Sequence, residues 1–287
     1  MSISKAPRPF FFNSLAIMAI SFVFCSDWSS EYSQSTFRFC VADVGQGLSQ
    51  FGYIGGRALV WDLGPGNQYS KWKTAYGQIG EPYLEAIIIS HTDEDHLGGL
   101  SMLDSNIGWS GNLIISSYED TAKVRAEAGF WKKRISFKFC GSMDTVGFLD
   151  SVLITCLWPP EGMDAERPLS SEERNRLSMV FLVQHGNNRV LITSDIDSLA
   201  QKMLCVQSGY SLSADILIAP HHGSAGSVDP IFFGYVSARK VIFSCSRHNS
   251  FGHPSTRMVE QCLSQGSTML YTFIDGSVIF ESNGFYW

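Results

Sequence analysis

The sequence predicts an α+β protein in which helices cover two packed β-sheets. Short apolar runs separated by turn signals fill the first half of the chain, and helical and strand patterns alternate along the second half. Residues 35–287 contain no low-complexity linker, so we expect a single domain there. An apolar fraction of 45% is that of a globular protein with a large core.

The first half of the domain reads mainly as strands. A Gly-rich turn at 45–47 follows the first strand, and Gly55-Gly56 signals a hairpin. The continuous apolar run Ala86-Ile87-Ile88-Ile89 predicts a buried strand over 85–90. A helix is expected around 119–129. The other expected strands of this half are 37–43, 50–54, 58–62, 112–116, 136–139 and 152–157.

The second half begins with a polar stretch, 159–177, which we interpret as a surface excursion. A hairpin turn at 185–188 then joins two strands, and helices and strands alternate to the end of the chain. Pro254 is expected in the first turn of the last helix, where proline is well tolerated. The expected elements are strands 178–184, 189–193, 215–219, 240–244, 269–273 and 277–281, helices 198–208 and 254–265, and an apolar segment at 231–236.

The N-terminus differs from the rest of the chain. Lys5 and Arg8 precede an apolar run from Phe10 to Cys25, which is the pattern of an export signal. The run is shorter than the ~20 apolar residues that a spanning helix needs, but an uncleaved anchor or a buried helix is an alternative. We therefore expect residues 1–25 to be a signal or anchor. The protein would be exported, to the periplasm or outside the cell, and would meet the membrane only through this segment.

The chain has seven cysteines, and six remain once Cys25 is assigned to the signal. An even number in an exported protein permits disulfides, but the sequence does not determine their pairing. Most of the six lie in apolar runs, where a free cysteine is a small core residue. No C-x-x-C pair occurs, so a cysteine-based zinc site is not expected.

The strongest chemical signal is His91-Thr-Asp93-Glu-Asp95-His96, which follows the strand expected at 85–90. Four potential metal ligands fall within six residues, in a loop expected to lead into a helix near Leu97. Imidazole with carboxylate suits zinc, manganese or iron better than calcium. The alternative is a solvated polar loop, whose clustered acids would repel one another without a cation.

Further candidate ligands lie where other expected strands end. Asp195 ends one strand, although its alternative role is to cap the next helix. His221 and His222 follow another strand, and His253 stands at a helix start, where it could orient a substrate or donate a proton. The other two histidines, His185 and His248, are expected to be ordinary surface residues.

At these residues the chain resembles the metallo-β-lactamase superfamily, and within it the hydrolase domain of ComEC-type competence proteins. That branch has H-x-D-x-D-H, which the segment from His91 to His96 matches. The resemblance spans about residues 37–282, and no membrane channel of the competence proteins is present in this stretch. The other segments that resemble this branch are Asp43-Val-Gly-Gln-Gly47, Asp62-Leu-Gly64, Trp158-Pro-Pro160, Asn175 to Ser178, the strand ending at Asp195, His221-His222-Gly-Ser224 and Gly252-His253-Pro-Ser255.

The resemblance implies an αββα sandwich with two divalent metal ions, manganese or zinc, at the sheet edge. Asp195 would be the bridging ligand, and either His221 or His222 a further ligand. Leu48 and Ser194 depart from the family pattern, which has Asp and Gly there, and this puts substrate choice in doubt more than activity. The ligands implied in the motif are His91, Asp93, Asp95 and His96.

These features predict an exported metal-dependent hydrolase, most plausibly a phosphodiesterase or nuclease. Two ions about 3.5–4 Å apart would hold a bridging water and lower its pKa, so that hydroxide attacks the phosphodiester. We expect Asp95, Asp195 and His253 to be the catalytic residues. Asp93, an oxygen ligand in place of imidazole, shifts the preference from zinc towards manganese.

The substrate class is the least determined part of this prediction. The net charge of −6 gives no basic footprint, so DNA as a partner would require metal ions and local Lys or Arg to offset its phosphates. Two alternatives stay open, an esterase or lactonase on the same fold and a non-catalytic metal-binding module.

Overall fold

The computed structural model describes residues 36–147, 149, 151–163 and 168–287. The export segment expected at 1–25, including Cys25, lies outside the described residues. Within them the strands form two sheets, one of seven strands and one of six. Among the helices of these described ranges, none combines the length and apolar character needed to cross a bilayer.

The first sheet is antiparallel at one side and parallel at the other. Strands β13, β1, β2 and β3 pair antiparallel, whereas β3, β4, β5 and β6 pair parallel. Its order is β13 (Val278–Ser282), β1 (Phe37–Val41), β2 (Gln50–Ile54), β3 (Arg57–Trp61), β4 (Tyr83–Ile89), β5 (Asn112–Ile115) and β6 (Ser136–Phe139).

The second sheet has the same mixed character. Strands β9 to β12 run parallel, and the hairpins β7–β8 and β8–β9 are antiparallel. Its order is β12 (Thr268–Tyr271), β11 (Lys240–Phe243), β10 (Ile216–Ile218), β9 (Asn188–Ile192), β8 (Val180–His185) and β7 (Val152–Trp158).

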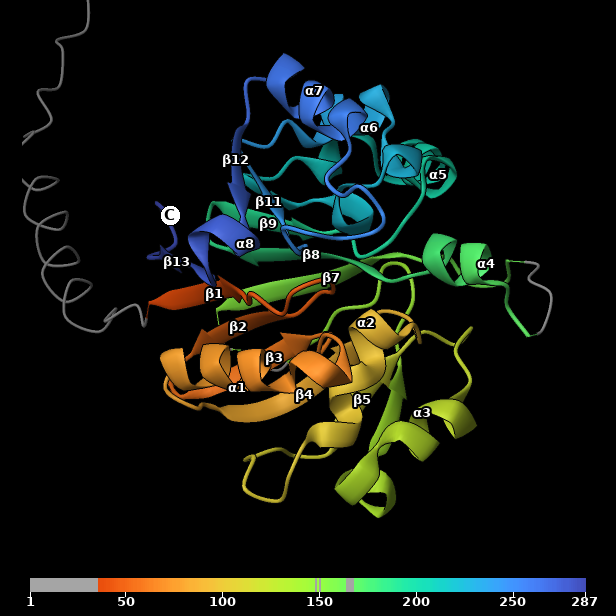
Figure 1. The fold of residues 1–287 in the computed structure, drawn as a ribbon. Helices are drawn as coiled ribbons and strands as arrows, with labels where there is room; N and C mark the ends of the chain where they lie inside the picture. Colours follow the sequence, from red (N-terminus) through yellow and green to blue (C-terminus); the bar gives the residue numbers. More distant parts are fainter. Residues whose placement is uncertain (1–35, 148, 150, 164–167) are drawn as a thin grey trace, which may run out of the picture. The chain divides into compact units, whose positions relative to one another are not determined.

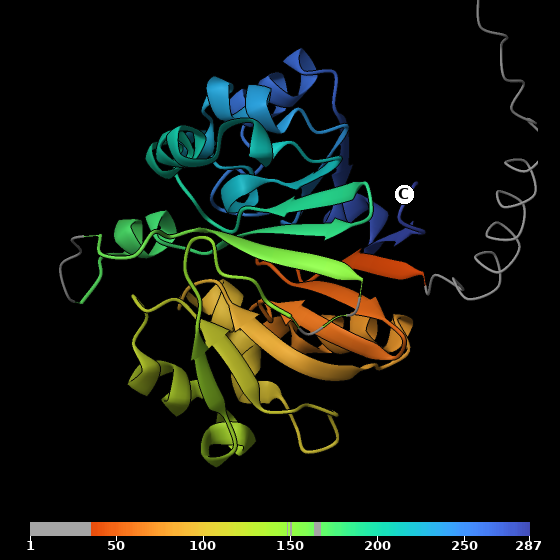
Figure 2. The same ribbon diagram turned by 180° about the vertical axis from the view of Figure 1, so that it is seen from behind.

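Helices cover the outer face of each sheet (Figures 1 and 2). The α-helices are α1 (Tyr69–Gln78), α2 (Glu94–Leu97), α3 (Thr121–Glu127), α4 (Ser171–Arg176), α5 (Ser198–Ser208), α6 (Pro230–Val236), α7 (Thr256–Ser264) and α8 (Thr272–Asp275). Short 3₁₀ helices are Gly66–Gln68, Gly98–Met102, Gly129–Lys133, Gly209–Leu212, Pro220–Gly223 and Ala225–Ser227.

Three apolar layers hold these elements together. Trp61 of the first sheet meets Phe181 of the second in the layer between the sheets, with ring centroids 6.2 Å apart. Trp72 of α1 packs under the first sheet, and Phe232 of α6 packs over the second. Burial of such side chains contributes roughly 1.5–3 kcal/mol each. The order helix, sheet, sheet, helix confirms the expected αββα sandwich.

Most expected elements are present, but several details of the expectation are wrong. Helices α1, α4 and α8 were not predicted, the last because a strand was expected as far as residue 273, and α2 begins at Glu94 rather than near Leu97. Pro254 lies just before Ser255, the N-cap of α7, and so precedes the helix. His185 is buried, and its Nδ1 lies 2.8 Å from Ser282 Oγ, whereas His248 is exposed as expected.

The six described cysteines are all buried and free. Burial raises the pKa of the Cys40, Cys245 and Cys262 thiols to about 12, which keeps them protonated at neutral pH. These thiols are therefore core residues, as their apolar surroundings in the sequence indicate. No disulfide joins any two cysteines of the described ranges.

Candidate metal centre

The carboxyl ends of parallel strands from both sheets meet at one edge of the sandwich. β3 is followed by Asp62, β4 by His91, β9 by Asp195 and β10 by His222. Polar groups at such strand ends can converge because the loops there take no part in the hydrogen bonding of the sheet. This edge therefore gathers side chains from four separate segments of the chain.

The first-sheet half of the centre comes from the six-residue motif. His91 follows the strand β4, two residues after its last residue Ile89, and a single helical turn, α2, then carries Asp95 and His96. His91 and His96 are fully buried, with ring centroids 4.1 Å apart. The earlier start of α2 matters here, because it places Asp95 and His96 on adjacent helical positions instead of in a loop.

Asp62 and Ser90 orient the two buried rings. Asp62 Oδ2 lies 2.7 Å from His96 Nδ1, and its two oxygens also accept hydrogen bonds from Ser90 N–H (2.8 Å) and Ser90 Oγ–H (2.7 Å). Ser90 Oγ lies 3.0 Å from His91 Nδ1. Each Nδ1 is thus occupied, so the Nε2 atoms face the centre, as ligating histidines require. The sequence analysis gave Asp62 no role, although an acid at a strand end was the available signal.

The backbone at the end of the Gly-Gln-Gly turn, residues 45–47, hydrogen-bonds to the backbone of the motif. Leu48 N–H donates to the carbonyl of Asp95 at 3.0 Å. A Cβ on Gly47 would lie 2.6 Å from that same oxygen, so only glycine allows this approach. The side chain of Leu48 is buried in the layer between the sheets. The departure from the family's Asp at this position therefore alters the core and not the contact with Asp95.

The second-sheet half is centred on Asp195, which is 3% exposed. Its N–H donates to Ser178 Oγ at 3.0 Å, and its Oδ1 lies 3.2 Å from His96 Nε2. The preceding residue, Ser194, has φ of 44°, the left-handed region that glycine adopts most easily. Ser194 tolerates it while its hydroxyl donates to Met179 O at 2.8 Å. This explains how serine replaces the family's usual glycine.

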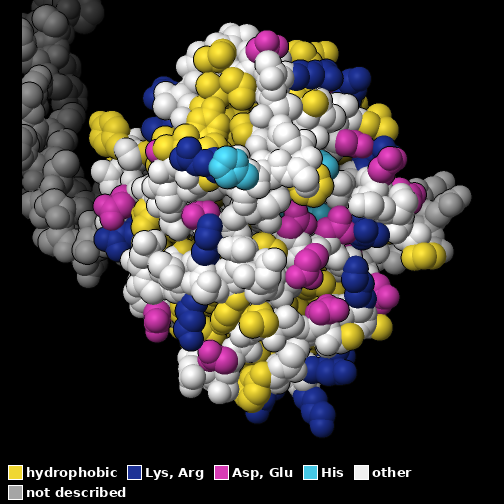
Figure 3. Space-filling model, in the orientation of Figure 1, with side chains coloured by type: hydrophobic (Ala, Val, Ile, Leu, Met, Phe, Trp, Pro, Cys, Tyr) yellow, Lys and Arg dark blue, Asp and Glu magenta, His cyan; other side chains and the backbone are white. Residues whose placement is uncertain are grey.

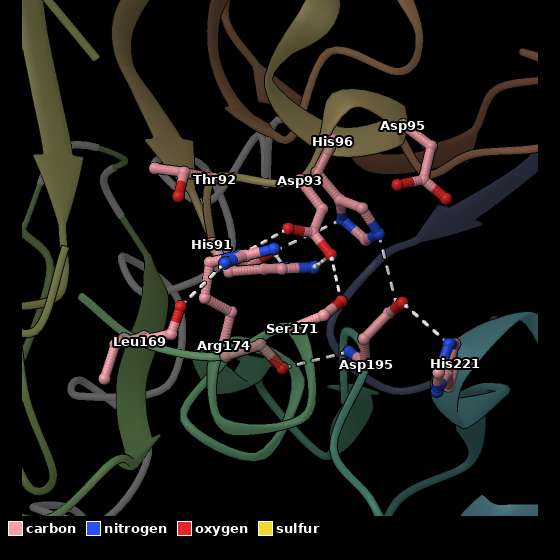
Figure 4. Close-up of polar contacts among 12 residues, drawn as sticks. His91, Thr92, Asp93, Asp95, His96, Leu169, Ser171, Arg174, Asp195 and His221 are labelled. Carbon is pink, nitrogen blue, oxygen red and sulfur yellow. Dashed lines mark hydrogen bonds and ion pairs between the residues drawn. The ribbon is translucent and has the colours of Figure 1, made fainter. Parts of the chain in front are cut away.

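His221 and His222 have different surroundings. Both lie in the left-handed region, with φ of 47° and 55°. His222 is buried, its Nδ1 lies 2.9 Å from Ser244 O, and its Nε2 lies 3.3 Å from Asp95 Oδ2. The side chain of His221 is 29% exposed, with Nε2 3.5 Å from Asp195 Oδ2. His222 therefore joins the two halves of the centre, and the partly exposed His221 lies beside Asp195 (Figure 4).

His253 lies beside these two histidines and not among the acids. Its ring stacks on His222, with centroids 6.3 Å apart, and on Phe251 at 5.6 Å. Burial, and then the neighbouring His222 and His221, lower the pKa of His253 to about 4. Its imidazole is therefore uncharged at neutral pH. Its Nδ1 is buried without a hydrogen-bond partner in the described structure.

Asp93 points to a different partner (Figure 4). Its Oδ1 accepts a hydrogen bond from Arg174 Nε at 2.5 Å, and Ser171 Oγ donates to its Oδ2 at 3.4 Å. His91 Nε2 is 3.9 Å from Asp93 Oδ2. Arg174 and Ser171 both belong to α4, a helix that was not predicted from the sequence. Its signal was the capping box, in which Ser170 and Glu173 bond each other's backbone N–H.

Among the described residues, four buried ligand atoms at the centre make no hydrogen bond: His91 Nε2, His96 Nε2, His222 Nε2 and Asp195 Oδ1. Their nearest polar neighbours are one another and Asp95, since His96 Nε2 lies 3.2 Å from Asp195 Oδ1 and His222 Nε2 lies 3.3 Å from Asp95 Oδ2. A buried polar atom without a partner costs free energy, and such atoms are few in folded proteins. Here they converge. Ligand atoms within 4.8 Å of one another form two groups, His91 with His96 and Asp195, and Asp95 with His96 and His222. The residues present therefore fit a divalent metal ion.

The charges of the centre are coupled. Burial disfavours the charged forms, but Asp195 and Asp62 outweigh it and hold the pKa of His96 well above its usual value. Burial opposes ionisation of Asp195 too, yet His222 and His96 hold its pKa well below the usual range. Burial, and then the proximity of His96, lower the pKa of His91 to about 4. A neutral His91 and an ionised Asp195 are the forms that bind metal.

Comparison with known proteins identifies the relatives of the chain. No protein-family model matches it. It is 26% identical over 246 residues to the uncharacterized protein YcaI of Escherichia coli, a match that covers 81% of this chain and 28% of that protein. Competence protein ComA of Neisseria gonorrhoeae is 24% identical over 245 residues (84% and 31%). Recombination protein 2 of Haemophilus influenzae is 24% identical over 263 residues (86% and 29%). The chain thus spans less than a third of the length of these relatives.

Solved structures agree on the fold. The metallo-β-lactamase fold protein YhfI of Bacillus subtilis matches with a TM-score of 0.53 and 14% identity, over 86% of this chain and 100% of that one. Zinc-bound PqqB of Methylobacterium extorquens matches with a TM-score of 0.55 and 11% identity (85% and 99%). The chain has the metallo-β-lactamase fold, and in sequence it is similar to the competence proteins of the ComEC type.

Proposed function

We propose that the chain is a metal-dependent hydrolase that cleaves phosphodiester bonds, with nucleic acid as its substrate. The observation that carries this proposal is the convergence, at the carboxyl ends of strands from two sheets, of four buried ligand atoms that make no hydrogen bond within the described residues. A centre with only a structural role would be closed on every side. Here the side chains of Asp95 and His221 are 35% and 29% exposed, which leaves an approach for a substrate.

His91, His96, His222, Asp95 and Asp195 would hold the metal. Asp195 would bridge two ions, because its Oδ1 faces His96 and its Oδ2 faces His221 and His222. A bound divalent ion supplies Lewis acidity, which activates water as a nucleophile and offsets charge on the scissile group. The two ions, manganese or zinc, and the individual ligand assignments are parts of this proposal.

The remaining residues would position groups or move protons. Asp62 and Ser90 keep the Nε2 atoms of His91 and His96 turned to the centre. His253, uncharged at neutral pH, lines the open side next to His221, with ring centroids 5.7 Å apart. From there the N–H of the neutral imidazole could donate a hydrogen bond to a leaving-group oxygen and stabilise the negative charge that develops on it, while the proton for that oxygen comes from water.

The similarity to proteins named for competence and recombination favours a nucleic acid over a small ester. The fold alone does not decide the substrate, because the same fold serves unrelated chemistries. A carboxylic ester or lactone is therefore the competing substrate class. A protein that binds metal without turnover is the competing non-catalytic outcome.

The test is turnover by metal-stripped protein reloaded with Mn²⁺ or Zn²⁺, on an aryl phosphodiester and on a matched aryl carboxylic ester. We expect metal-dependent hydrolysis of the phosphodiester. His222→Ala should lose both bound metal and turnover, whereas His248→Ala, which changes an exposed histidine, should keep both. Preferential ester hydrolysis would overturn the substrate class, and metal binding without any turnover would overturn the enzymatic proposal.

A further inference from the structure

An exposed basic surface begins close to the metal centre. Residues 121–139 contain six of the chain's 21 Lys and Arg residues but only one of its 27 Asp and Glu residues. We call these six the basic face: Lys123, Arg125, Lys132, Lys133, Arg134 and Lys138. Figure 3 shows dark blue side chains gathered at the lower edge of the molecule, below the place of α3 in Figure 1. This local excess of positive charge contrasts with the net charge of −6 of the whole chain.

The basic face is continuous because its elements contact one another. Arg125 of α3 donates to the carbonyl of Lys132 at 2.9 Å, in the 3₁₀ helix Gly129–Lys133. Its guanidinium also lies 4.9 Å from the ring centre of Phe137 on β6. One arginine thus connects the helix, the 3₁₀ helix and the edge strand of the first sheet. Arg125, Lys132 and Phe137 therefore lie together on the helix-covered side of the sheet, whereas Lys138, the next residue along β6, projects from the other face of this edge strand.

The same face reaches the metal motif at its other end. Lys123 Nζ donates to the carbonyl of Thr92 at 2.9 Å, and Thr92 stands between His91 and Asp93. A pocket of about 610 Å³ opens at this junction. Glu119 lies on its wall, 5% exposed, with an Oε1 that has no hydrogen-bond partner in the described structure. Residues that line the pocket include Thr92, Tyr118, Glu119, Lys123, Leu169 and Arg174.

Aromatic rings accompany the cations. Phe130 is 47% exposed, and Arg134 lies 4.1 Å from its ring centre. Phe139 is 59% exposed, and it ends β6. Because β4, β5 and β6 are parallel, Phe139 lies at the same sheet edge as His91, two strands away. Exposed rings among cations are the surface that unpaired bases stack on, whereas bases of a duplex are covered.

We propose that the basic face binds a single strand of nucleic acid, with phosphates on its Lys and Arg side chains and bases on Phe130 and Phe139. The pocket at Lys123 would admit the end of the strand that reaches the metal centre, where the partnerless Glu119 Oε1 could accept a hydrogen bond from a sugar or base. This inference rests on the proposed phosphodiesterase function. It adds the surface on which the substrate binds and specifies that the substrate is single-stranded.

The charge-reversal pair Lys132→Glu/Lys133→Glu tests the face away from the metal centre. Both lysines are exposed, and neither is among the proposed ligands. The matched control is Lys202→Glu/Arg239→Glu, two exposed cations on the second-sheet side, which changes the net charge by the same amount. Binding of a fluorescent oligothymidylate to metal-stripped protein would be measured by anisotropy at several salt concentrations.

We expect the Lys132/Lys133 pair to weaken binding at least about tenfold and to reduce the salt slope of log K by roughly 1.4, for two lost phosphate contacts on a single strand. The control pair should differ from the native protein much less. The neutral pair Lys132→Gln/Lys133→Gln, compared with Lys202→Gln/Arg239→Gln, gives the same test if the reversed variants do not fold. Equal losses for both pairs would overturn the proposal. So would binding of phosphatidylserine vesicles in place of the oligonucleotide, or tighter binding of a matched duplex.

Turnover separates this inference from the proposed function. With metal restored, the Lys132/Lys133 pair should lower kcat/KM on the oligonucleotide but leave hydrolysis of a small aryl phosphodiester unchanged. If the native protein is inactive on both substrates, the proposed function is wrong, whatever the binding result. If it is active on the small substrate and the Lys132/Lys133 and Lys202/Arg239 variants have identical oligonucleotide kinetics, only the inference about the basic face is wrong.

Discussion

The two halves of the metal centre are built in opposite ways. The first-sheet half takes His91, Asp95 and His96 from six consecutive residues at the end of one strand. The second-sheet half takes Asp195 and His222 from separate loops after β9 and β10. Local helical geometry sets the first half, whereas the alignment of the parallel strands sets the second. The first half can therefore be read as a motif, and the second exists only once the sheets have packed.

The halves also differ in backbone conformation. In the second half Ser194, His221 and His222 adopt left-handed conformations, whereas among the non-glycine residues of the first half only Asp62, outside the six-residue motif, does so, with φ of 55°. Such conformations cost about 1–3 kcal/mol each and persist only where surrounding contacts impose them. The second half is thus dependent on its packing, and the first half on the hydrogen bonds of Asp62 and Ser90.

The largest effect should come from Asp195→Ala, which removes the residue on which the two halves meet. We expect loss of metal retention and of hydrolysis, beyond the roughly 10²–10³-fold that loss of a single stabilising donor costs. Metal content per chain, turnover and a thermal melt would be measured together. A folded variant with native activity would show that the halves do not depend on Asp195.

The next largest effect should come from Asp62→Asn, which keeps the shape but removes the charge beside His96 Nδ1. Loss of such an orienting partner typically lowers metal affinity by about 10–100-fold. Isothermal titration with Zn²⁺ would measure it, with Asp104→Asn, an exposed carboxylate, as the control. Native Zn²⁺ affinity in the Asp62 variant would contradict the role of this residue in orienting His96.

A smaller effect is expected for Asp93→His. We expect Mn²⁺ to restore more activity than Zn²⁺ in the stripped native protein, and the histidine variant to shift modestly towards Zn²⁺. The substitution also removes the anion bound by Arg174, so Asp93→Asn is the control for that loss. The same metal ranking in all three proteins would mean that Asp93 does not set the preference and acts by holding Arg174.

The smallest effect concerns stability near Glu119. Burial raises the pKa of this carboxyl from its ordinary value of 4.5 to about 7, so between these pH values the folded state binds a proton that the unfolded state releases. Stability should therefore fall as pH rises from about 4.5 to about 7 and stay level above that, by roughly 1–3 kcal/mol. Glu119→Gln should remove this loss and be the more stable protein at pH 8. Urea unfolding at pH 5 and pH 8 measures the difference, and Glu127→Gln, exposed on α3, should behave as the native protein.

The sequence predicted the sandwich and the grouping of His91, Asp95 and His96, because apolar strands and a contiguous ligand motif are local signals. That these residues and Asp93 bind metal stays a prediction. It also named Asp195, His221, His222 and His253, which the fold brings to the same edge. It did not choose between His221 and His222, because that difference depends on Ser244, 22 residues away. It gave Asp62 no role and missed Arg174 as the partner of Asp93, since both contacts join residues distant in the chain.

His96 belongs to both groups of ligand atoms at the centre. Its Nδ1 is engaged by Asp62, so only Nε2 is free to coordinate. One nitrogen lone pair binds one cation. With the side chains placed as they are, coordination through His96 in one group would leave the other group with two of its three donors. Whether the centre holds one ion or two would then depend on a single imidazole nitrogen, and two ions would be held with unequal affinities.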